Sequence, residues 1–172
     1  MAVTIMRSVA FGLCLWLGGL VLPATASTMD ADTAAASARE LVERWLELQH
    51  QRTTQIDGYR TLVVERGWEI QLVEGEARSF AQLEALLGQR FDGLSASRYR
   101  IAYFKTAPRG NGLLRVWVEL DWQGTQDDGL AAVARLDVEL TLGEMPDGQL
   151  RIRRLSERYL APLQGNGARI KC

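Results

Sequence analysis

The chain has 172 residues, with 20 basic and 21 acidic side chains and a net charge of −1 at neutral pH. The two signs are interspersed, so the chain lacks the basic footprint that nucleic acid or an anionic lipid surface requires, and we expect no nucleic-acid partner. One histidine and two cysteines offer little to a metal or to thiol chemistry, and we predict no metal and no cofactor.

Residues 1–26 have the pattern of a secretory signal peptide. Arg7 is their only charged side chain, and an uncharged run of 14 residues follows from position 9 to 22. This run is shorter than the ~20 residues with which a helix crosses a bilayer. Ala24-Thr25-Ala26 offers the small residues that a signal peptidase reads. We expect cleavage after Ala26, a periplasmic or secreted location, and no membrane insertion afterwards; an uncleaved anchor is the alternative.

Two helical patterns follow a short leader, which we place at residues 27–33 and expect to be flexible. From Thr33 onward, apolar residues recur at steps of three and four, which predicts an amphipathic helix: Ala34, Ala38, Leu41, Trp45 and Leu48. A second helical pattern runs through Ile56, Tyr59, Leu62 and Val63. It ends at Arg66-Gly67, and glycine is common just past a helix end. Two separate helices and one bent helix both fit.

Strand patterns dominate the rest of the chain. Alternation predicts a short strand over residues 68–72, and Ser79 is expected to cap a third helix that ends near Gly88. Four longer strand segments come next, joined by turn-rich links that favour hairpins: residues 97–106, 113–122, 131–142 and 150–157. This order predicts an α+β fold, with three N-terminal helices packed on one face of a curved antiparallel sheet. We place one domain at residues 34–163 and a flexible tail at 164–172.

The order of elements resembles the nuclear transport factor 2-like superfamily, also called SnoaL-like. The resemblance rests on an opening helix, a third helix, a closing hairpin and the residues after it: Leu41-Val-Glu-Arg-Trp-Leu-Glu-Leu48, Ser79-Phe-Ala-Gln-Leu-Glu-Ala-Leu-Leu87, residues 138–152 and Glu157-Arg-Tyr159. It implies a cone-shaped, cystatin-like domain with a pocket between helices and sheet. Members include isomerases, dehydratases, cyclases and non-enzymatic binding modules, so the fold alone does not decide function.

The residues of the ketosteroid-isomerase-like members are not matched. Aligned by eye, their opening-helix tyrosine falls at Trp45 and their base near Gln71, while their third group falls near Ala134 or Arg135. On the two central strands one face is wholly apolar and the other carries mixed charges, so no acid or base interrupts the face toward the helices. We therefore assign no catalytic residue. The candidates we weigh are Glu69, His50 and Asp57, each of which also fits a solvated position.

The inward polar groups are mostly aromatic, and we predict a ligand pocket formed by Trp45, Tyr59, Tyr99 and Tyr103. Trp117 lies among charges on the other face and is a candidate interface residue for a homodimer. We expect a non-catalytic ligand-binding or assembly module that takes an apolar small molecule. The alternatives are an isomerase, dehydratase or cyclase acting on an apolar substrate, and a periplasmic carrier of a lipid-like ligand. The terminal Cys172 is expected to be exposed.

Overall fold

The computed structural model describes residues 30–161 and 164–165. The predicted signal peptide, the first three residues of the predicted leader and Cys172 lie outside these residues. Three helices come early in the chain, α1 (Ala31–His50), α2 (Ile56–Arg60) and α3 (Phe80–Phe91). Two short strands, β1 (Glu69–Leu72) and β2 (Gly75–Ala77), separate α2 from α3. Four long strands and one short strand follow: β3 (Leu94–Gly110), β4 (Leu113–Gln126), β5 (Ala131–Glu144), β6 (Leu150–Tyr159) and β7 (Gln164–Gly165).

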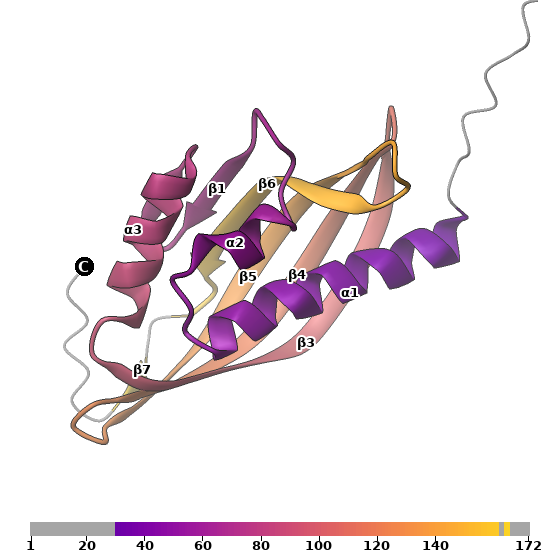
Figure 1. The fold of residues 1–172 in the computed structure, drawn as a ribbon. Coiled ribbons are helices and arrows are strands. Elements are labelled where there is room, and N and C mark those ends of the chain that lie inside the picture. The colour runs from indigo at the N-terminus through magenta and orange to yellow at the C-terminus, as the bar shows by residue number, and fades with distance from the viewer. Residues whose placement is uncertain (1–29, 162–163, 166–172) are drawn as a thin grey trace, which may run out of the picture.

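All the described strands belong to one sheet, in the order β2-β1-β6-β5-β4-β3, with β7 paired to β5. Every pairing is antiparallel except that of β1 with β6, which is parallel. The sheet curves, and the helices lie on its concave side, with α1 along the long strands and α3 beside β1 (Figure 1). The α+β fold with three helices on a curved, mostly antiparallel sheet is confirmed. None of the helices in the described part of the chain is long and apolar enough to span a membrane.

The helix boundaries differ from the sequence patterns in three places. α1 begins at Ala31, inside the segment assigned to a leader, because alanines and Asp32 favour a first helical turn there. α1 and α2 are separate, and α2 is only five residues long. Leu62 ends a turn, and Val63 forms a parallel bridge with Ile152, flanked by backbone hydrogen bonds from Val64 N to Ile152 O and from Ile152 N to Leu62 O. The apolar residues at 62 and 63 therefore pack at the edge of the sheet and do not continue a helix. α3 continues past Gly88 to Phe91.

The end of the chain also departs from expectation. Gln164 and Gly165 form β7, which pairs with Val133 and Ala132 of β5, although both residues fall in the segment predicted to be a flexible tail. The strand β2 was not predicted either. It pairs with β1 through a tight turn at Val73 and Glu74, and Gly75 after this turn has a φ of 153°. The short strand and its turn place Glu74 near the end of α3.

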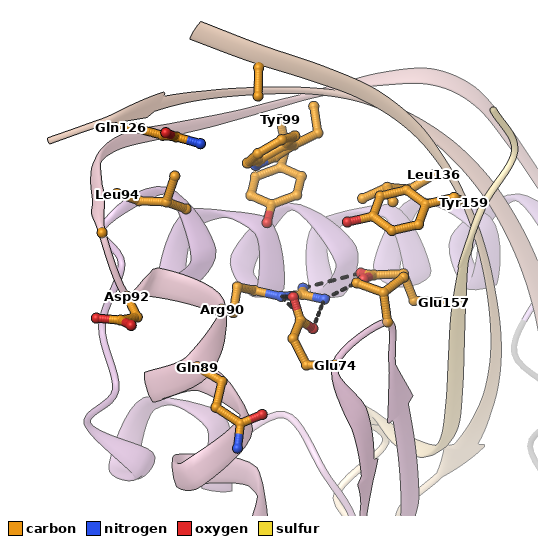
Figure 2. Close-up of a pocket in the computed structure, with 14 residues that line it drawn as sticks. Glu74, Gln89, Arg90, Asp92, Leu94, Tyr99, Gln126, Leu136, Glu157 and Tyr159 are labelled. Atoms are coloured by element: carbon orange, nitrogen blue, oxygen red, sulfur yellow. Dashed lines mark hydrogen bonds and ion pairs between the residues drawn. The ribbon is translucent and has the colours of Figure 1, made fainter. Parts of the chain in front are cut away.

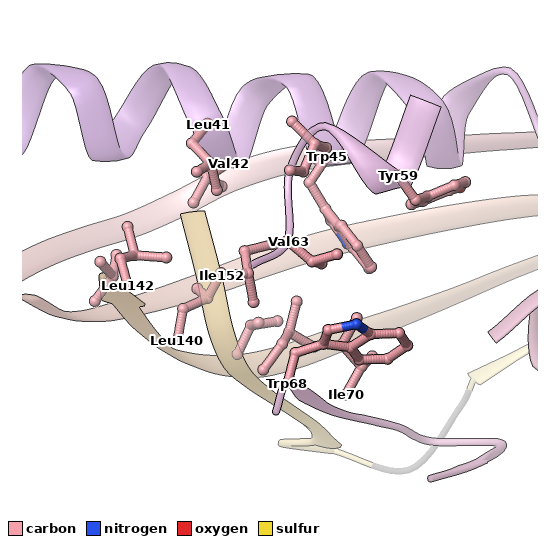
Figure 3. Packing of buried hydrophobic residues seen from close by; sticks show 14 of the residues in the cluster. Leu41, Val42, Trp45, Tyr59, Val63, Trp68, Ile70, Leu140, Leu142 and Ile152 are labelled. Carbon is pink, nitrogen blue, oxygen red and sulfur yellow. The ribbon is translucent and has the colours of Figure 1, made fainter. Parts of the chain in front are cut away.

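The core lies between α1 and the concave face of the sheet. Along β4 and β5, buried and less buried residues alternate as the sequence predicted, with Val116, Val118 and Leu140 among the most buried. Trp45 packs edge-on against Tyr59 with ring centroids 5.0 Å apart (Figure 3). Burial of each such side chain stabilises the fold by about 1.5–3 kcal/mol. The prediction of an apolar inner face on these two central strands is therefore confirmed.

Candidate functional site

An open cavity of about 390 Å³ lies where the end of α3 meets the sheet. We call it the cone cavity. Its apolar and aromatic lining comes mostly from the long strands: Val73, Leu94, Tyr99, Trp122, Ala132, Leu136 and Tyr159. Its polar lining comes mainly from α3, the β1–β2 turn and β6: Glu74, Gln89, Arg90, Asp92, Gln126 and Glu157. Figure 2 shows Tyr99 and Tyr159 on one side of this space and the Arg90 guanidinium on the other.

A buried ion cluster forms one wall of the cone cavity, and we define it as Arg90, Glu74, Glu157 and Gln49. Arg90 Nη1 donates to Glu157 Oε2 at 3.2 Å, and Nη2 donates to the other oxygen of the same carboxylate. Nε and Nη2 donate to Glu74 at 3.1 and 2.6 Å, and Nη1 also donates to Gln49 Oε1 at 3.2 Å. All the nitrogens of the guanidinium are therefore engaged by the cluster.

The local sequence explains why these charges lie inside. On α3, Arg90 follows Leu83, Leu86 and Leu87 at helical spacing, so it lies on the buried face of the helix. On β6, Glu157 lies two residues after buried Leu155 and therefore faces the same way. The side chains of Arg90 and Glu157 are only 6% and 3% exposed, whereas that of Glu74 is 21% exposed. Glu74 is thus the carboxylate of the cluster that is most accessible from solvent.

The guanidinium of Arg90 remains charged despite its burial. Burial lowers the pKa of Arg90, but the nearby carboxylates of Glu157 and Glu74 outweigh this effect and hold the pKa well above its usual range. Burial raises the pKa of Tyr99 to about 12, although the positive charge of Arg90 opposes this shift. With one guanidinium and two carboxylates, the cluster carries a formal charge of −1. Such a group stays buried only where its hydrogen bonds are satisfied.

Of the four predicted pocket residues, Tyr99 alone lines the cone cavity. Trp45 and Tyr59 lie in the core. The Tyr59 hydroxyl accepts from Gln49 Nε2 at 3.1 Å and donates to the Thr53 carbonyl at 3.2 Å, so it supports the ion cluster through Gln49. Burial raises the pKa of Tyr59 far above its usual value. Tyr59 therefore stays a neutral hydroxyl.

Tyr103 lies on the opposite face of the sheet from Tyr99. The pairing of β3 with β4 shifts register between Ile101 and Tyr103, which marks a β-bulge. The bulge inserts one residue and reverses the alternation of faces. Tyr103 consequently pairs with Glu119 and is 47% exposed, whereas Ile101 pairs with buried Leu120.

None of the three catalytic candidates weighed from the sequence lines the cone cavity. Glu69 pairs with Arg154 at 2.9 Å and with Arg78 at 3.8 Å. Asp57 is almost fully exposed and lies 3.5 Å from Arg60. His50 packs edge-on against Tyr99 with ring centroids 6.2 Å apart, and it borders a separate, more open hollow.

Trp117 lies on what we call the outer face of the sheet, the face that bears Arg115, Trp117, Glu119, Asp121, Arg135, Asp137 and Glu139. The Arg115 guanidinium lies 4.7 Å from the Trp117 ring centroid and the Lys105 ammonium 5.9 Å from it. Ion pairs continue along this face, from Arg115 to Glu139 and from Asp121 to both Arg100 and Arg135. The outer face is therefore a network of exposed charges around one half-buried indole.

Sequence reasoning missed the ion cluster, although part of its signal is in the sequence. On the inward face, acids and bases were sought along the two central strands, and elsewhere only Glu69, His50 and Asp57 were weighed. Glu157 lies on the last long strand and Arg90 on a helix. Extending the same alternation to β6 would have shown Glu157 facing inward. Within residues 30–161, His, Cys, Asp and Glu form no group of three or more that could hold a metal ion.

No family model matches the chain. No curated protein matches it significantly in sequence. Several solved structures do match its fold. One is a nuclear transport factor 2-like superfamily protein from Salmonella enterica serovar Typhimurium, with a TM-score of 0.68 and 12% identity over 77% of this chain and 95% of the other.

Two further matches carry the names of enzymes. A hexachlorocyclohexane dehydrochlorinase from Novosphingobium barchaimii has a TM-score of 0.67 and 9% identity, over 78% of this chain and 90% of the other. A Novosphingobium aromaticivorans protein named as a scytalone dehydratase has a TM-score of 0.65 and 9% identity, over 79% and 88%. At these identities the likeness establishes the fold and not the chemistry. The chain has the nuclear transport factor 2-like fold, as the order of its elements predicted.

Proposed function

We propose that this protein binds a small organic molecule in the cone cavity, and that it does so outside the cytoplasm after removal of residues 1–26. One observation carries the proposal: a cavity of about 390 Å³ with a wall of aromatic and aliphatic side chains facing a wall of polar ones. This volume lies within the range of about 300–1,000 Å³ that is typical of ligand pockets. Export is supported by the signal-peptide pattern.

Binding without chemistry fits the cavity best. A general base must reach the substrate with a free lone pair and an adequate proton affinity. Both carboxylate oxygens of Glu74 accept hydrogen bonds from Arg90, and so do both oxygens of Glu157. Each of these oxygens already accepts from the guanidinium, so a substrate proton would have to compete with Arg90 for it. The ion cluster therefore serves as a fixed polar wall.

A pair of size-matched variants tests this proposal. Ala132 is buried and lines the cone cavity, whereas its neighbour Ala131 is exposed. In Ala132→Phe the new ring occupies the cavity, and we expect it to abolish binding; Ala131→Phe should bind as the wild type does. Ligand-detected NMR with indole as a neutral probe and native mass spectrometry of protein from its own source provide the readouts. Indole or a copurified ligand retained by a folded Ala132→Phe variant would place the binding elsewhere.

A second candidate is an isomerase, dehydratase or cyclase that acts on an apolar substrate. The observation that supports it is the presence of the partly exposed carboxylate of Glu74 and the neutral hydroxyl of Tyr99 in one cavity. Loss of turnover in both Glu74→Gln and Tyr99→Phe, with ligand binding retained, would establish this candidate. Turnover that survives both substitutions would remove it. Transport of a lipid-like ligand is a third use of the same cavity.

A further inference from the structure

We propose that the cone cavity selects a cation, namely an organic ammonium group carried on an apolar or aromatic body. This inference rests on the proposed binding function and names the ligand class of the same cavity. It follows from three observations. The lining has an excess of carboxylates, the guanidinium of Arg90 has all its N–H donors engaged, and aromatic side chains lie opposite these groups.

The charged groups of the lining are unequal in number. Glu74, Asp92 and Glu157 contribute three carboxylates, and Arg90 contributes the one guanidinium; the other described lining residues are neutral. The cavity wall therefore has a formal charge of −2. Arg52 reaches the carbonyl oxygen of Leu94 at the rim, but its side chain is not part of the lining. Next to a partly buried wall, an excess charge is screened less than on an open surface.

Arg90 has no donor left for an anionic ligand. Its Nε bonds to Glu74, its Nη1 to Gln49 and Glu157, and its Nη2 to Glu74 and Glu157. An anion could bind this guanidinium only by displacing a carboxylate, which would leave that carboxylate buried and unpaired. The arginine therefore does not turn the cavity into an anion site. It holds two carboxylates in place at the cavity wall.

Aromatic side chains face this acidic wall. Tyr99, Trp122 and Tyr159 line the cavity, and Figure 2 shows the Tyr99 hydroxyl directed toward Arg90. The Trp122 indole is held by a hydrogen bond from Nε1 to Ser97 Oγ at 3.0 Å and by close packing over Gly124, where any Cβ would clash with the ring. Aromatic rings combined with nearby carboxylates are the environment that stabilises organic ammonium groups.

Three probes of one shape and different charge test the inference. Phenyltrimethylammonium, tert-butylbenzene and benzenesulfonate share a phenyl ring and a tetrahedral head, which is cationic, neutral and anionic respectively. We expect the cation to bind at least about tenfold more tightly than the neutral probe, and the anion not to bind. Binding is measured on the mature wild-type chain by NMR titration at low ionic strength, where charge is least screened.

Charge-matched variants locate the effect. Glu74→Gln removes one carboxylate from the cavity wall, and we expect it to weaken phenyltrimethylammonium binding roughly tenfold while tert-butylbenzene binding stays unchanged. Glu84→Gln removes the same charge from the exposed face of α3 and should change neither. Asp92→Asn, at an exposed position of the rim, provides a second test should Glu74→Gln fold poorly; it should weaken the cation in the same direction.

The outcomes separate this inference from the function on which it rests. If tert-butylbenzene binds as tightly as the cation, or benzenesulfonate binds more tightly, the cation inference is overturned and the binding function stands. An equal loss of cation binding in Glu74→Gln and Glu84→Gln would also overturn it, since a general charge effect would then explain the preference. If Ala132→Phe affects none of the three probes, both the inference and the proposed cavity are wrong.

Discussion

Arginine–carboxylate pairs occur in two regions of this molecule, in the ion cluster at the cone cavity and on the outer face of the sheet. In the ion cluster, Arg90 is 6% exposed and bonds to two carboxylates and an amide. On the outer face, Arg100 is 80% exposed and shares Asp121 with Arg135. Solvent can replace the partner of an exposed charge but not that of a buried one. The same chemistry should therefore be decisive for stability inside and nearly neutral outside.

The largest expected effect comes from removing the buried arginine. Arg90→Met leaves the buried Glu157 and the partly buried Glu74 without a counter-ion, and we expect it to destabilise the fold by about 3–5 kcal/mol. Arg100→Met on the outer face is the matched control, with an expected cost of at most about 1 kcal/mol. Urea denaturation of both variants at neutral pH measures the difference. Equal losses of stability would show that the two regions do not differ as described.

Neutralising one carboxylate of the cluster should have a smaller effect. Glu157→Gln keeps the shape and leaves Arg90 paired with Glu74, so we expect a cost of about 1.5–3 kcal/mol, typical of a hydrogen bond to a charged group. Asp137→Asn is its counterpart outside, where Arg158 holds Asp137 in an exposed pair. Thermal denaturation compares the two. A Glu157→Gln variant as stable as the wild type would mean that the cluster needs only one carboxylate.

The outer face is expected to matter for association instead. We predict a homodimer through this face, and Trp117→Arg should shift it toward monomer by about 2 kcal/mol or more, since a buried tryptophan at an interface centre is often a hot spot. Leu130→Arg, at an exposed apolar residue in the β4–β5 turn, is the control. Sedimentation velocity over a concentration series provides the measurement. A wild type that is monomeric at high concentration, or a Trp117→Arg variant that stays dimeric, would contradict the prediction.

The smallest effect should be a pH dependence on the outer face. Hydrogen bonds from Arg100 and Arg135 hold the pKa of Asp121 below its usual value. The folded protein then binds a proton at Asp121 less readily than the unfolded chain does, so this pair stabilises the fold above the ordinary carboxyl pKa of about 4. The stability advantage over Asp121→Asn should shrink as the pH falls through and below that range. Urea denaturation of both proteins between pH 3 and 7 tests this. A difference in unfolding free energy that grows as the pH falls would contradict the prediction.

The fold could be predicted from the sequence because its signals are local and repeated. Alternation along β4 and β5 and the Ser79 cap before α3 are each signals of a single element. The Ser79 hydroxyl does accept a hydrogen bond from the backbone N–H of Gln82, as a helix cap should. The cavity depends on relations between elements. Tyr103 is an example, because a single β-bulge after Ile101 reverses the face that alternation predicts. Bulges leave no clear mark in the surrounding residue types.

The ion cluster shows a different limit. Arg90 and Glu157 each lie on a buried face that helical spacing or strand alternation can identify, yet they are 67 residues apart in sequence. Glu74 lies in a turn, where neither period applies. A charged side chain is stable inside a protein only beside an opposite charge. Which residue supplies that charge depends on how the helices and strands pack against one another. The sequence could therefore have identified two charges on apolar faces, but not their meeting at one cavity.

The contact between Trp122 and Gly124 has a consequence for how this protein can vary. Because the indole occupies the space over Gly124, no other residue fits at position 124 while tryptophan is at position 122. The two positions are therefore a coupled pair in any mutational search: larger residues at 124 become acceptable only after the side chain at 122 has been reduced. A library that randomises both codons together should recover such exchanges, whereas one that samples single codons should find glycine alone.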